Sequence, residues 1–261
     1  MKSICIALLA SVLLVSCKNE KDTQTTASDN PVVETAAEKT EKELKINPIG
    51  HATMVLEWGE TVIYVDPVGG AERFAAFAEP DLILVTDIHG DHLSAETLAA
   101  VSTDKTKIIL PQACADKLPE EFTTQLDVLG NNETKTRYDI AVTGVPMYNL
   151  REEDKNKHVK GRGNGYILEA DKMRVYISGD TEDIPEMRAL EEINIAFVCM
   201  NLPYTMTVES AADAVVEFAP NTVYPYHYRG ADGLSDVAKF KELVDAAGKE
   251  IGVIQLDWYA N

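Results

Sequence analysis

The sequence is poor in cysteine and in basic residues. Its four cysteines, Cys5, Cys17, Cys114 and Cys199, lie far apart in 261 residues, and no two form a Cys-x-x-Cys pair. This spacing favours neither a disulfide framework nor a thiolate zinc site, so a metal ion would need His and carboxylate ligands. The 24 Lys and Arg are outnumbered by 43 Asp and Glu, giving a formal net charge of −19. We therefore expect no nucleic-acid partner.

Several common catalytic motifs are also missing. The sequence contains no Gly-x-Ser-x-Gly elbow, no Gly-x-x-x-x-Gly-Lys-Ser/Thr loop and no Gly-x-Gly-x-x-Gly turn. These absences disfavour a serine hydrolase, a P-loop nucleotidase and a dinucleotide-dependent enzyme. Apolar residues make up 45% of the chain and charged residues 26%, which is an ordinary composition for a globular protein.

The N-terminal segment has the features of an export signal. Lys2 is followed by an apolar run, Ile4 to Val15, which is too short to span a bilayer as a permanent helix. The run ends in Leu14-Val15-Ser16-Cys17, which resembles a bacterial lipobox. We expect residues 1–16 to be a lipoprotein signal peptide and Cys17 to carry the lipid, so that the protein is exported and anchored to a bacterial membrane on its extracytoplasmic side. The alternative is an ordinary signal peptide with a chance cysteine.

The chain after Cys17 divides into a tether and one domain. From Lys18 to about Glu43 almost no large apolar residue occurs, so residues 17–43 should form a disordered tether. Short apolar runs then alternate with helical patterns across residues 44–261. We expect strands at Thr53–Glu57, Val62–Val65, Leu82–Val85, Lys107–Leu110, Ile140–Val145, Gly165–Glu169, Arg174–Ile177, Ala196–Met200, Thr222–Tyr226 and Ile251–Gln255. We expect helices at Ala95–Val101, Gln112–Leu118, Pro185–Glu192, Val208–Phe218 and Asp232–Ala247.

This order of elements predicts an α/β fold. Strands that are first paired and then alternate with helices favour a sandwich of two mixed β-sheets flanked by helices, an αββα arrangement.

One segment concentrates metal-binding residue types. The apolar strand Leu82–Val85 is followed at once by a stretch that contains Asp87, His89, Asp91 and His92 within six residues. Two imidazoles and two carboxylates are enough for parts of two neighbouring metal sites. A polar turn that caps the next helix is the alternative, but it would not need two of the chain's five histidines.

Two later strands also end in candidate ligands. Asp180 follows Gly179 after the strand Arg174–Ile177, and His227 follows the strand Thr222–Tyr226. The carboxyl ends of strands are where open α/β sheets bind their ligands. Asp180 could bridge two cations, and the three segments together predict one metal centre.

These motifs resemble the metallo-β-lactamase superfamily. Its first motif, His-x-His-x-Asp-His, follows a buried strand, and a Gly-Asp strand end and a final histidine come later; the match runs from Ile46 to Trp258. The likeness is greatest to the ascorbate-6-phosphate lactonase-like branch. The segments that carry it are Gly50-His51-Ala52-Thr53 with Asp66-Pro67, Gly163-Asn164-Gly165-Tyr166, Gly179-Asp180-Thr181, Asn201-Leu202-Pro203-Tyr204-Thr205-Met206-Thr207 and Pro225-Tyr226-His227-Tyr228.

The resemblance implies a role for each matching residue. His89 would bind the first metal ion and Asp180 would bridge the two ions. The second ion would be bound by Asp91, His92 and His227. Asp66 matches an aspartate that braces the motif loop by contacting a ligand rather than the metal.

The sequence departs from the superfamily pattern at two positions. The first histidine of the motif is Asp87 here, and the histidine expected between the first motif and Gly179 has no counterpart in Val145–Asn149. Asp87 can still ligate through a carboxylate oxygen, and an oxygen-rich site would accept Mn²⁺ or Fe²⁺ as well as Zn²⁺. His158 could replace the missing histidine, or it could be a solvated loop residue or bind an anionic substrate.

Other residues are candidates for a role around the metal ions. The resemblance places His51 near the centre, as a catalytic proton donor or a group behind the ligands; the alternative is that His51 caps a turn. Segments expected to rim the site supply candidates for substrate contact, which are Tyr148, Asn201, Tyr204, Tyr228 and Arg229.

Together these features predict a metal-dependent hydrolase. Two divalent ions, most simply Zn²⁺, would generate hydroxide at neutral pH. Asp91 would orient the hydroxide as it attacks an ester, lactone, amide or phosphoester bond of a small or lipid substrate. The alternative is a non-catalytic metal- or ligand-binding lipoprotein in which Asp87 and the missing histidine have disabled the first metal site.

Overall fold

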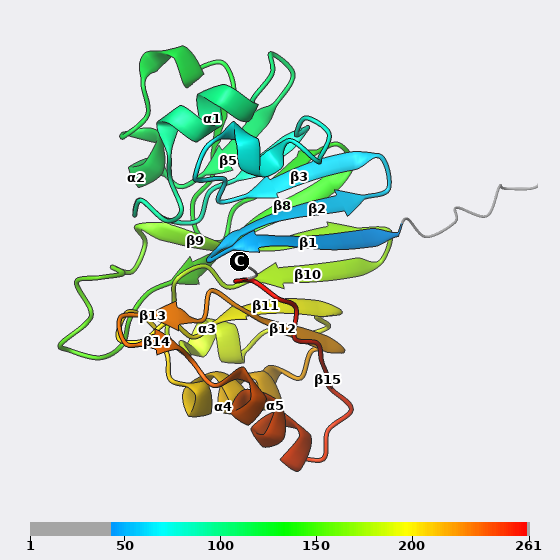
Figure 1. The fold of residues 1–261 in the computed structure, drawn as a ribbon, viewed down its shortest axis with the longest axis vertical. Coiled ribbons are helices and arrows are strands. Elements are labelled where there is room, and N and C mark those ends of the chain that lie inside the picture. The colour runs from blue at the N-terminus through cyan, green and yellow to red at the C-terminus, as the bar shows by residue number, and fades with distance from the viewer. Residues whose placement is uncertain (1–42, 260–261) are drawn as a thin grey trace, which may run out of the picture. The chain divides into compact units, whose positions relative to one another are not determined.

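The computed structural model describes residues 43–259 (Figure 1). The expected signal peptide, the lipidation site Cys17 and the tether up to residue 42 lie outside the described residues. Within residues 43–259, no helix is long and apolar enough to cross a membrane.

The first sheet has six strands in the order β1-β2-β3-β4-β5-β6. They are β1 (Leu44–Gly50), β2 (Thr53–Trp58), β3 (Thr61–Val65), β4 (Leu82–Leu84), β5 (Lys107–Leu110) and β6 (Leu126–Val128). β1, β2 and β3 pair antiparallel, whereas β3, β4, β5 and β6 run parallel. α1 (Ala95–Val101), α2 (Gln112–Ala115) and two 3-10 helices, Ala71–Phe74 and Glu120–Phe122, belong to this half of the domain.

The second sheet has seven strands in the order β15-β12-β11-β10-β9-β8-β7. They are β7 (Thr134–Arg137), β8 (Ile140–Met147), β9 (Gly163–Ala170), β10 (Met173–Ile177), β11 (Ile195–Cys199), β12 (Thr222–Tyr226) and β15 (Gly252–Val253). Its helices are α3 (Pro185–Arg188), α4 (Val208–Phe218) and α5 (Val237–Ala246), and a small hairpin joins β13 (Arg229–Gly230) to β14 (Gly233–Leu234).

The two sheets pack face to face between two layers of helices. Figure 1 shows α1 and α2 outside the first sheet and α4 and α5 outside the second. The predicted sandwich of two mixed sheets flanked by helices is therefore confirmed.

The first sheet packs against the second sheet on one face and against helices on the other. Side chains along its strands alternate between these two faces. In β2, Met54 and Leu56 join the core between the sheets, whereas Val55 joins the core under α1 and α2. β4 repeats the pattern, because Ile83 belongs to the outer core and its neighbours Leu82 and Leu84 to the inner one. Successive side chains of a strand point to opposite faces, so a sheet covered on both faces needs continuous apolar strands.

The structure differs from the sequence-based prediction at several elements. β1, β6, β7 and the hairpin of β13 and β14 were not expected. The last helix begins at Val237 rather than Asp232, because Asp236 caps it by accepting a hydrogen bond from the Lys239 amide. The predicted last strand shortens to Gly252–Val253. Ser94 caps α1 and Thr207 caps α4, since their side chains accept hydrogen bonds from backbone amides.

The strand directions bring many loops to one side of the sandwich. In the first sheet β1, β3 and β4 share a direction, and in the second sheet β8, β10, β11 and β12 do so. The segments after these strands contain every residue expected at the metal centre. Ligand sites of α/β sheets form at such carboxyl ends.

A substitution at Gly165 in β9 tests how closely β9 packs against the end of β10. A Cβ atom at this position would lie 2.8 Å from the carbonyl oxygen of Ser178 and 2.9 Å from that of Ile177. We expect Gly165→Ala to lower the free energy of unfolding by about 1–3 kcal/mol, because the backbone must shift. Denaturant titration measures this. Gly90→Ala is the matched control, since nothing lies within 4 Å of its added Cβ; equal stability of the two variants would contradict the account.

Candidate metal centre

Asp66 fixes the loop that carries the first motif. It follows β3 and is fully buried, with a left-handed backbone φ of 44°. Its carboxylate accepts hydrogen bonds from the Thr86 amide and hydroxyl, each at 2.7 Å, and lies 2.8 Å from Nδ1 of His92. This contact directs Nε2 of His92 away from Asp66 and into the site. Asp66 thus holds the motif loop through Thr86 and the candidate ligand His92, and its role behind a metal ligand stays a prediction.

Asp180 is delivered by the Gly-Asp strand end of β10. Gly179 has φ 61°, and a Cβ atom there would lie 2.7 Å from Sδ of Met147. Its amide donates to the Tyr226 hydroxyl at 3.0 Å. Glycine is therefore required before Asp180 by both conformation and space.

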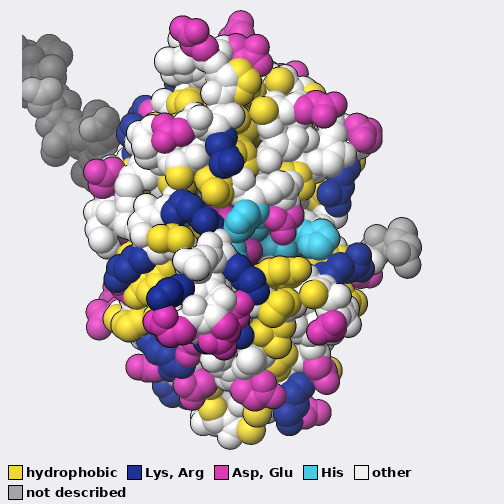
Figure 2. Space-filling model, turned by 90° about the vertical axis from the view of Figure 1, so that its left-hand side faces the viewer, with side chains coloured by type: hydrophobic (Ala, Val, Ile, Leu, Met, Phe, Trp, Pro, Cys, Tyr) yellow, Lys and Arg dark blue, Asp and Glu magenta, His cyan; other side chains and the backbone are white. Residues whose placement is uncertain are grey.

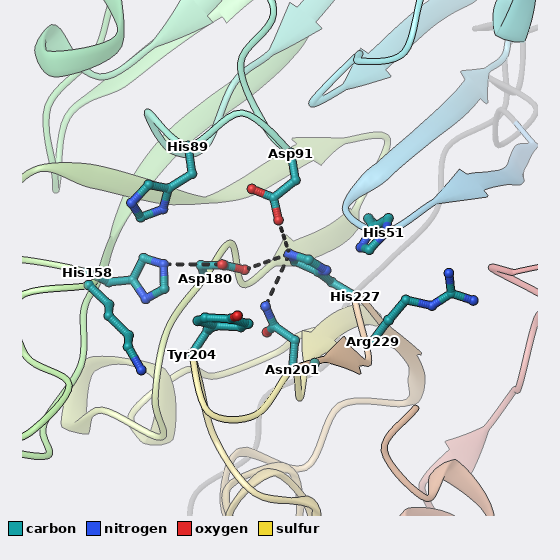
Figure 3. Close-up of a pocket in the computed structure, with 11 residues that line it drawn as sticks. His51, His89, Asp91, His158, Asp180, Asn201, Tyr204, His227 and Arg229 are labelled. Atoms are coloured by element: carbon teal, nitrogen blue, oxygen red, sulfur yellow. Dashed lines mark hydrogen bonds and ion pairs between the residues drawn. The ribbon is translucent and has the colours of Figure 1, made fainter. Parts of the chain in front are cut away.

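Asp180 lies between the other candidate ligands (Figure 3). Nε2 of His158 is 3.2 Å from its Oδ2 and Nε2 of His92 is 3.4 Å from the same oxygen. Nε2 of His227 is 3.3 Å from the other oxygen, Oδ1. One buried carboxylate therefore faces three imidazoles.

Two groups of ligands meet at Asp180. Asp87, His89 and His158 form one group whose ligand atoms lie within 4.8 Å of one another, and His92, Asp180 and His227 form another. Asp91 joins the second group, since its Oδ2 is 3.4 Å from Nε2 of His227. The seven residues that the sequence predicted as ligands are thus brought together, although their binding of metal stays a prediction.

His158 is the histidine that the structure brings next to Asp87 and His89. It comes from the long loop between β8 and β9, and its side chain is only 2% exposed. Its Nδ1 lies 3.1 Å from Oδ1 of Asn149, which leaves Nε2 facing Asp180. Its ring packs edge-on to that of His89 at a centroid distance of 5.2 Å. The interpretation of His158 as a solvated loop residue is therefore wrong.

Asp87 has two partners that the sequence did not indicate. Its Oδ2 is 2.6 Å from Nδ1 of His89, and the guanidinium of Arg162 is 3.3 Å from both of its oxygens. Burial alone would raise the pKa of Asp87, but the hydrogen bond with His89 and the nearby positive charges lower it. The Asp87 carboxylate is thus held ionised and able to ligate.

The charges of the second group favour a bound cation. Burial opposes the ionisation of Asp180, yet His227 and His92 hold its pKa well below the ordinary value. Burial likewise opposes the protonation of His92, but Asp180 and Asp66 raise its pKa well above 6.5. The field that draws a proton to His92 would also attract a metal ion.

Unpartnered atoms support the same conclusion. Nε2 of His92 and Oδ1 of Asp180 are buried, and within residues 43–259 neither makes a hydrogen bond. Buried polar atoms without partners are rare in folded proteins. Imidazole and carboxylate atoms that converge without hydrogen bonding fit the ligand set of Zn²⁺ or of a harder divalent ion.

His51 lies at the other end of the cavity from His89 (Figure 3). It has φ 50°, and its ring packs edge-on to those of His227 and Tyr259 at 5.5 and 5.3 Å. It forms a third possible ligand group with Asp91 and His227. Burial and the charge of His227 lower the pKa of His51, so it is available as a neutral ligand or as a group that exchanges a proton.

A cavity of about 490 Å³ opens over the centre. Of the residues expected to contact substrate, Asn201, Tyr204 and Arg229 line it, whereas Tyr148 and Tyr228 do not. The Tyr148 hydroxyl instead donates to Glu186 at 2.8 Å. Tyr228 is buried against Tyr259, with ring centroids 4.9 Å apart.

As with Arg162, the contributions of Lys157 and Tyr259 to the site were not identified from the sequence. Lys157 lines the cavity, and Tyr259 packs on both His51 and Arg229. The run of basic residues around His158 was the available signal for Lys157. No local pattern marked Tyr259, which reaches the site from the C-terminal segment.

Comparisons with known proteins agree with this geometry. Residues 45–227 match the family model described as the β-lactamase superfamily domain. A UPF0173 metal-dependent hydrolase from Pyrococcus abyssi is 31% identical over 220 residues, covering 80% of this chain and 95% of the relative.

Solved structures show the same similarity. The crystal structure of a candidate metal-dependent hydrolase from Parabacteroides distasonis is 39% identical, with a TM-score of 0.72 over 81% of this chain and 93% of its own. A metallo hydrolase from Ignicoccus hospitalis shares the fold at 22% identity, with a TM-score of 0.68 over 82% of this chain and 94% of its own.

The bracing contact of Asp66 can be tested without a substrate. Asp66→Asn keeps the size of the side chain but weakens its bonds to His92 and Thr86. We expect about 10- to 100-fold weaker Zn²⁺ binding, the usual cost of losing a group that orients a ligand. Competition with a chromogenic chelator measures the affinity. Asp127→Asn is the control, because Asp127 is also buried but pairs with Lys135 and Arg137; equal losses in both variants would refute the role of Asp66.

Proposed function

This chain belongs to the metallo-β-lactamase superfamily and to its UPF0173 family of metal-dependent hydrolases, and from this membership we propose the chemistry of its site. The protein would hold two divalent metal ions, most simply Zn²⁺, with Mn²⁺ or Fe²⁺ as substitutes. It would hydrolyse an ester, lactone, amide or phosphoester bond of a small or lipid substrate.

The position of Asp180 is the observation that carries this proposal. Its Oδ2 lies near His158, which belongs to the group of Asp87 and His89, and its Oδ1 lies near His227, which belongs to the group of Asp91 and His92. A carboxylate placed between two ligand sets is suited to bridge two cations. His89 and His158 would then hold one ion, together with Asp87, and His92 and His227 the other, together with Asp91.

The chemistry that bound divalent ions supply is Lewis acidity, which lowers the pKa of water to about 7 and polarises the bond to be broken. The protein's own groups must place the water and the substrate. Asp91 is half-exposed at the cavity, with its Oδ2 3.4 Å from Nε2 of His227, so its carboxylate can orient a water molecule toward the substrate.

Asn201 is suited to contact the polarised oxygen of the substrate. The Thr205 hydroxyl donates to Oδ1 of Asn201 at 2.5 Å, which fixes the amide so that Nδ2 lies 3.3 Å from Nε2 of His227. The amide NH₂ group therefore faces the cavity, where a fixed donor can stabilise developing negative charge. His51, on the same wall, can accept and pass on a proton.

A non-catalytic binding protein is the weaker alternative. This alternative assumes that the first metal site is incomplete, because the superfamily has a histidine in place of Asp87 and a further histidine that the sequence lacks. Asp87 and His158 both face His89, and their ligand atoms lie within 4.8 Å of one another. The candidate ligands of the first site are therefore present, which favours a hydrolase.

The location of the protein is part of the proposal. The lipobox-like segment ending at Cys17 supports export and a lipid anchor in a bacterial membrane. The hydrolase domain would lie on the extracytoplasmic side, within reach of small or lipid substrates at that surface.

Metal content and activity should change together. We expect the purified protein to bind about two equivalents of Zn²⁺ and His158→Ala about one, because the first group would lose a ligand. Chelation should abolish hydrolysis of a panel of esters, lactones and phosphodiesters, and Zn²⁺ or Mn²⁺ should restore it.

The double variant His89→Ala/His92→Ala sets the zero for both measurements. Elemental analysis and initial rates provide the readouts. Two retained equivalents in His158→Ala would remove His158 from the centre, and hydrolysis that survives chelation would contradict a metal-dependent reaction.

The lipid anchor has a separate test. We expect the wild-type protein to sediment with membranes and to be labelled by a clickable palmitate analogue, whereas Cys17→Ser should be unlabelled and mostly released. Cys5→Ser should behave as wild type, because Cys5 lies within the expected signal peptide. Labelling of Cys17→Ser would show that Cys17 is not the lipidated residue.

A further inference from the structure

The cavity carries positive side chains although the protein is strongly acidic. Its lining includes two carboxylates, Asp91 and Asp180, and two cations, Lys157 and Arg229. The whole chain has a formal net charge of −19. Figure 2 shows exposed His side chains on one face of the molecule with Lys and Arg side chains nearby. With divalent ions bound as proposed above, the cavity would attract anions.

Lys157 is already paired within the protein. Its Nζ lies 2.5 Å from Oδ1 of Asp154, donates to the Pro203 carbonyl at 3.3 Å and is 5.1 Å from the centre of the Tyr204 ring. These contacts occupy the ammonium group and offset its charge. Lys157 is therefore poorly placed to bind a further anion.

Arg229 differs because no carboxylate of the described residues lies within 4.0 Å of its guanidinium. The group packs over the ring of Tyr259, with Cζ 4.3 Å from the ring centre. Stacking of this kind fixes the plane of the guanidinium and leaves its N–H donors free at the edges. The planar group matches the two oxygens of a carboxylate or phosphate.

The backbone around Arg229 is tightly held. Its amide donates to the Tyr259 hydroxyl at 3.0 Å. A Cβ atom at Gly230 would lie 1.7 Å from the carbonyl oxygen of Leu202, so this stretch packs against the segment that carries Asn201 and Tyr204. Arg229 therefore starts from a fixed position two residues after His227.

Figure 3 shows how Arg229 lies relative to the centre. It is on the side of the cavity with His51, and Asp180 and His227 lie between it and His158. A substrate whose reacting bond lies at Asp180 could therefore extend toward Arg229.

We propose that Arg229 is a specificity-determining residue that binds an anionic group, a carboxylate or a phosphate, at the end of the substrate remote from the bond that is cleaved. This inference rests on the proposed function, because it takes the reacting bond to lie at the metal centre. It narrows the substrate to an anionic ester, lactone, amide or phosphoester.

Hydroxamates with matched tails test this without requiring turnover. A hydroxamate group binds divalent ions, so the tail samples the rest of the cavity. We compare succinic acid monohydroxamate and 3-phosphonopropionohydroxamate, which have anionic tails, with the uncharged butyrohydroxamate. Calorimetry on the Zn²⁺-loaded full-length protein gives each affinity, and elemental analysis afterwards confirms that the metal is retained.

We expect wild-type protein to bind at least one anionic compound about tenfold or more tightly than butyrohydroxamate, since hydrogen bonds between charged groups are the stronger ones. Which tail is preferred distinguishes a carboxylate from a phosphate substrate. Arg229→Gln should lose this preference and keep its affinity for butyrohydroxamate, and Arg229→Lys should keep part of it. Lys117→Gln, which removes an exposed charge near α2, should bind all three compounds as wild type does.

Two results would overturn the proposal. Equal affinity of the wild-type protein for all three compounds contradicts it, even if Arg229→Gln fails to fold. A preference that survives in Arg229→Gln but is lost in Lys157→Gln would assign the anion to Lys157 instead.

Two esters with matching tails separate this proposal from the proposed function. Esters of succinic acid and of butyric acid are offered to the same protein samples. A tail preference in binding without hydrolysis of any ester would keep the role of Arg229 and reject the hydrolytic assignment for esters. Hydrolysis of both esters at equal rates, with no tail preference in binding, would support the hydrolytic assignment and reject the role of Arg229.

Discussion

Three aspartates are buried at the ends of strands from both sheets, and neighbouring groups of the site compensate their negative charge. Asp66, Asp87 and Asp180 are almost wholly removed from solvent, and an isolated buried carboxylate is very costly. Asp66 is hydrogen-bonded to Thr86 and His92, and Asp87 contacts His89 and Arg162. Asp180 lies 3.2–3.4 Å from three imidazole nitrogens, but its Oδ1 makes no hydrogen bond within the described residues. All five histidines of the chain lie around this cluster. Bound divalent ions would compensate the remaining negative charge. The carboxylates and imidazoles that hold the loops in place therefore also predict a metal centre.

The site is held in place by strained backbone and close packing. His51, Asp66 and His227 all have positive φ angles, a conformation that residues other than glycine rarely adopt. Such conformations persist where the surrounding structure imposes them, and they cluster at functional sites. Here each of the three residues follows the end of a strand, so the turn aims its side chain across the cavity or, for Asp66, at the motif loop. Side chains held in this way would form a preorganised metal site.

Much of this centre could be predicted from the sequence, because its ligands follow apolar strands in short motifs. The segment from Asp87 to His92 and the positions of Asp180 and His227 are examples, and the layered fold followed from the order of the strands. The sequence does not decide whether His158 is a ligand, because it lies in a long loop whose conformation no regular pattern predicts. Tyr228 was expected to contact substrate, but its side chain does not line the cavity. Its neighbour His227 points into the site, and successive side chains point in different directions. β7 (Thr134–Arg137) was not predicted from the sequence, because this edge strand is polar and has no alternating apolar residues.

The central claim is that two metal ions share Asp180, with Asp87, His89 and His158 completing one of the two sites. The most direct measurement is anomalous diffraction at the zinc edge from crystals of the Zn²⁺-loaded protein. We predict two peaks on either side of Asp180, one within bonding distance of Asp87, His89 and His158 and the other near Asp91, His92 and His227. A single peak at the second position, with Asp87 still paired to Arg162, would contradict the claim.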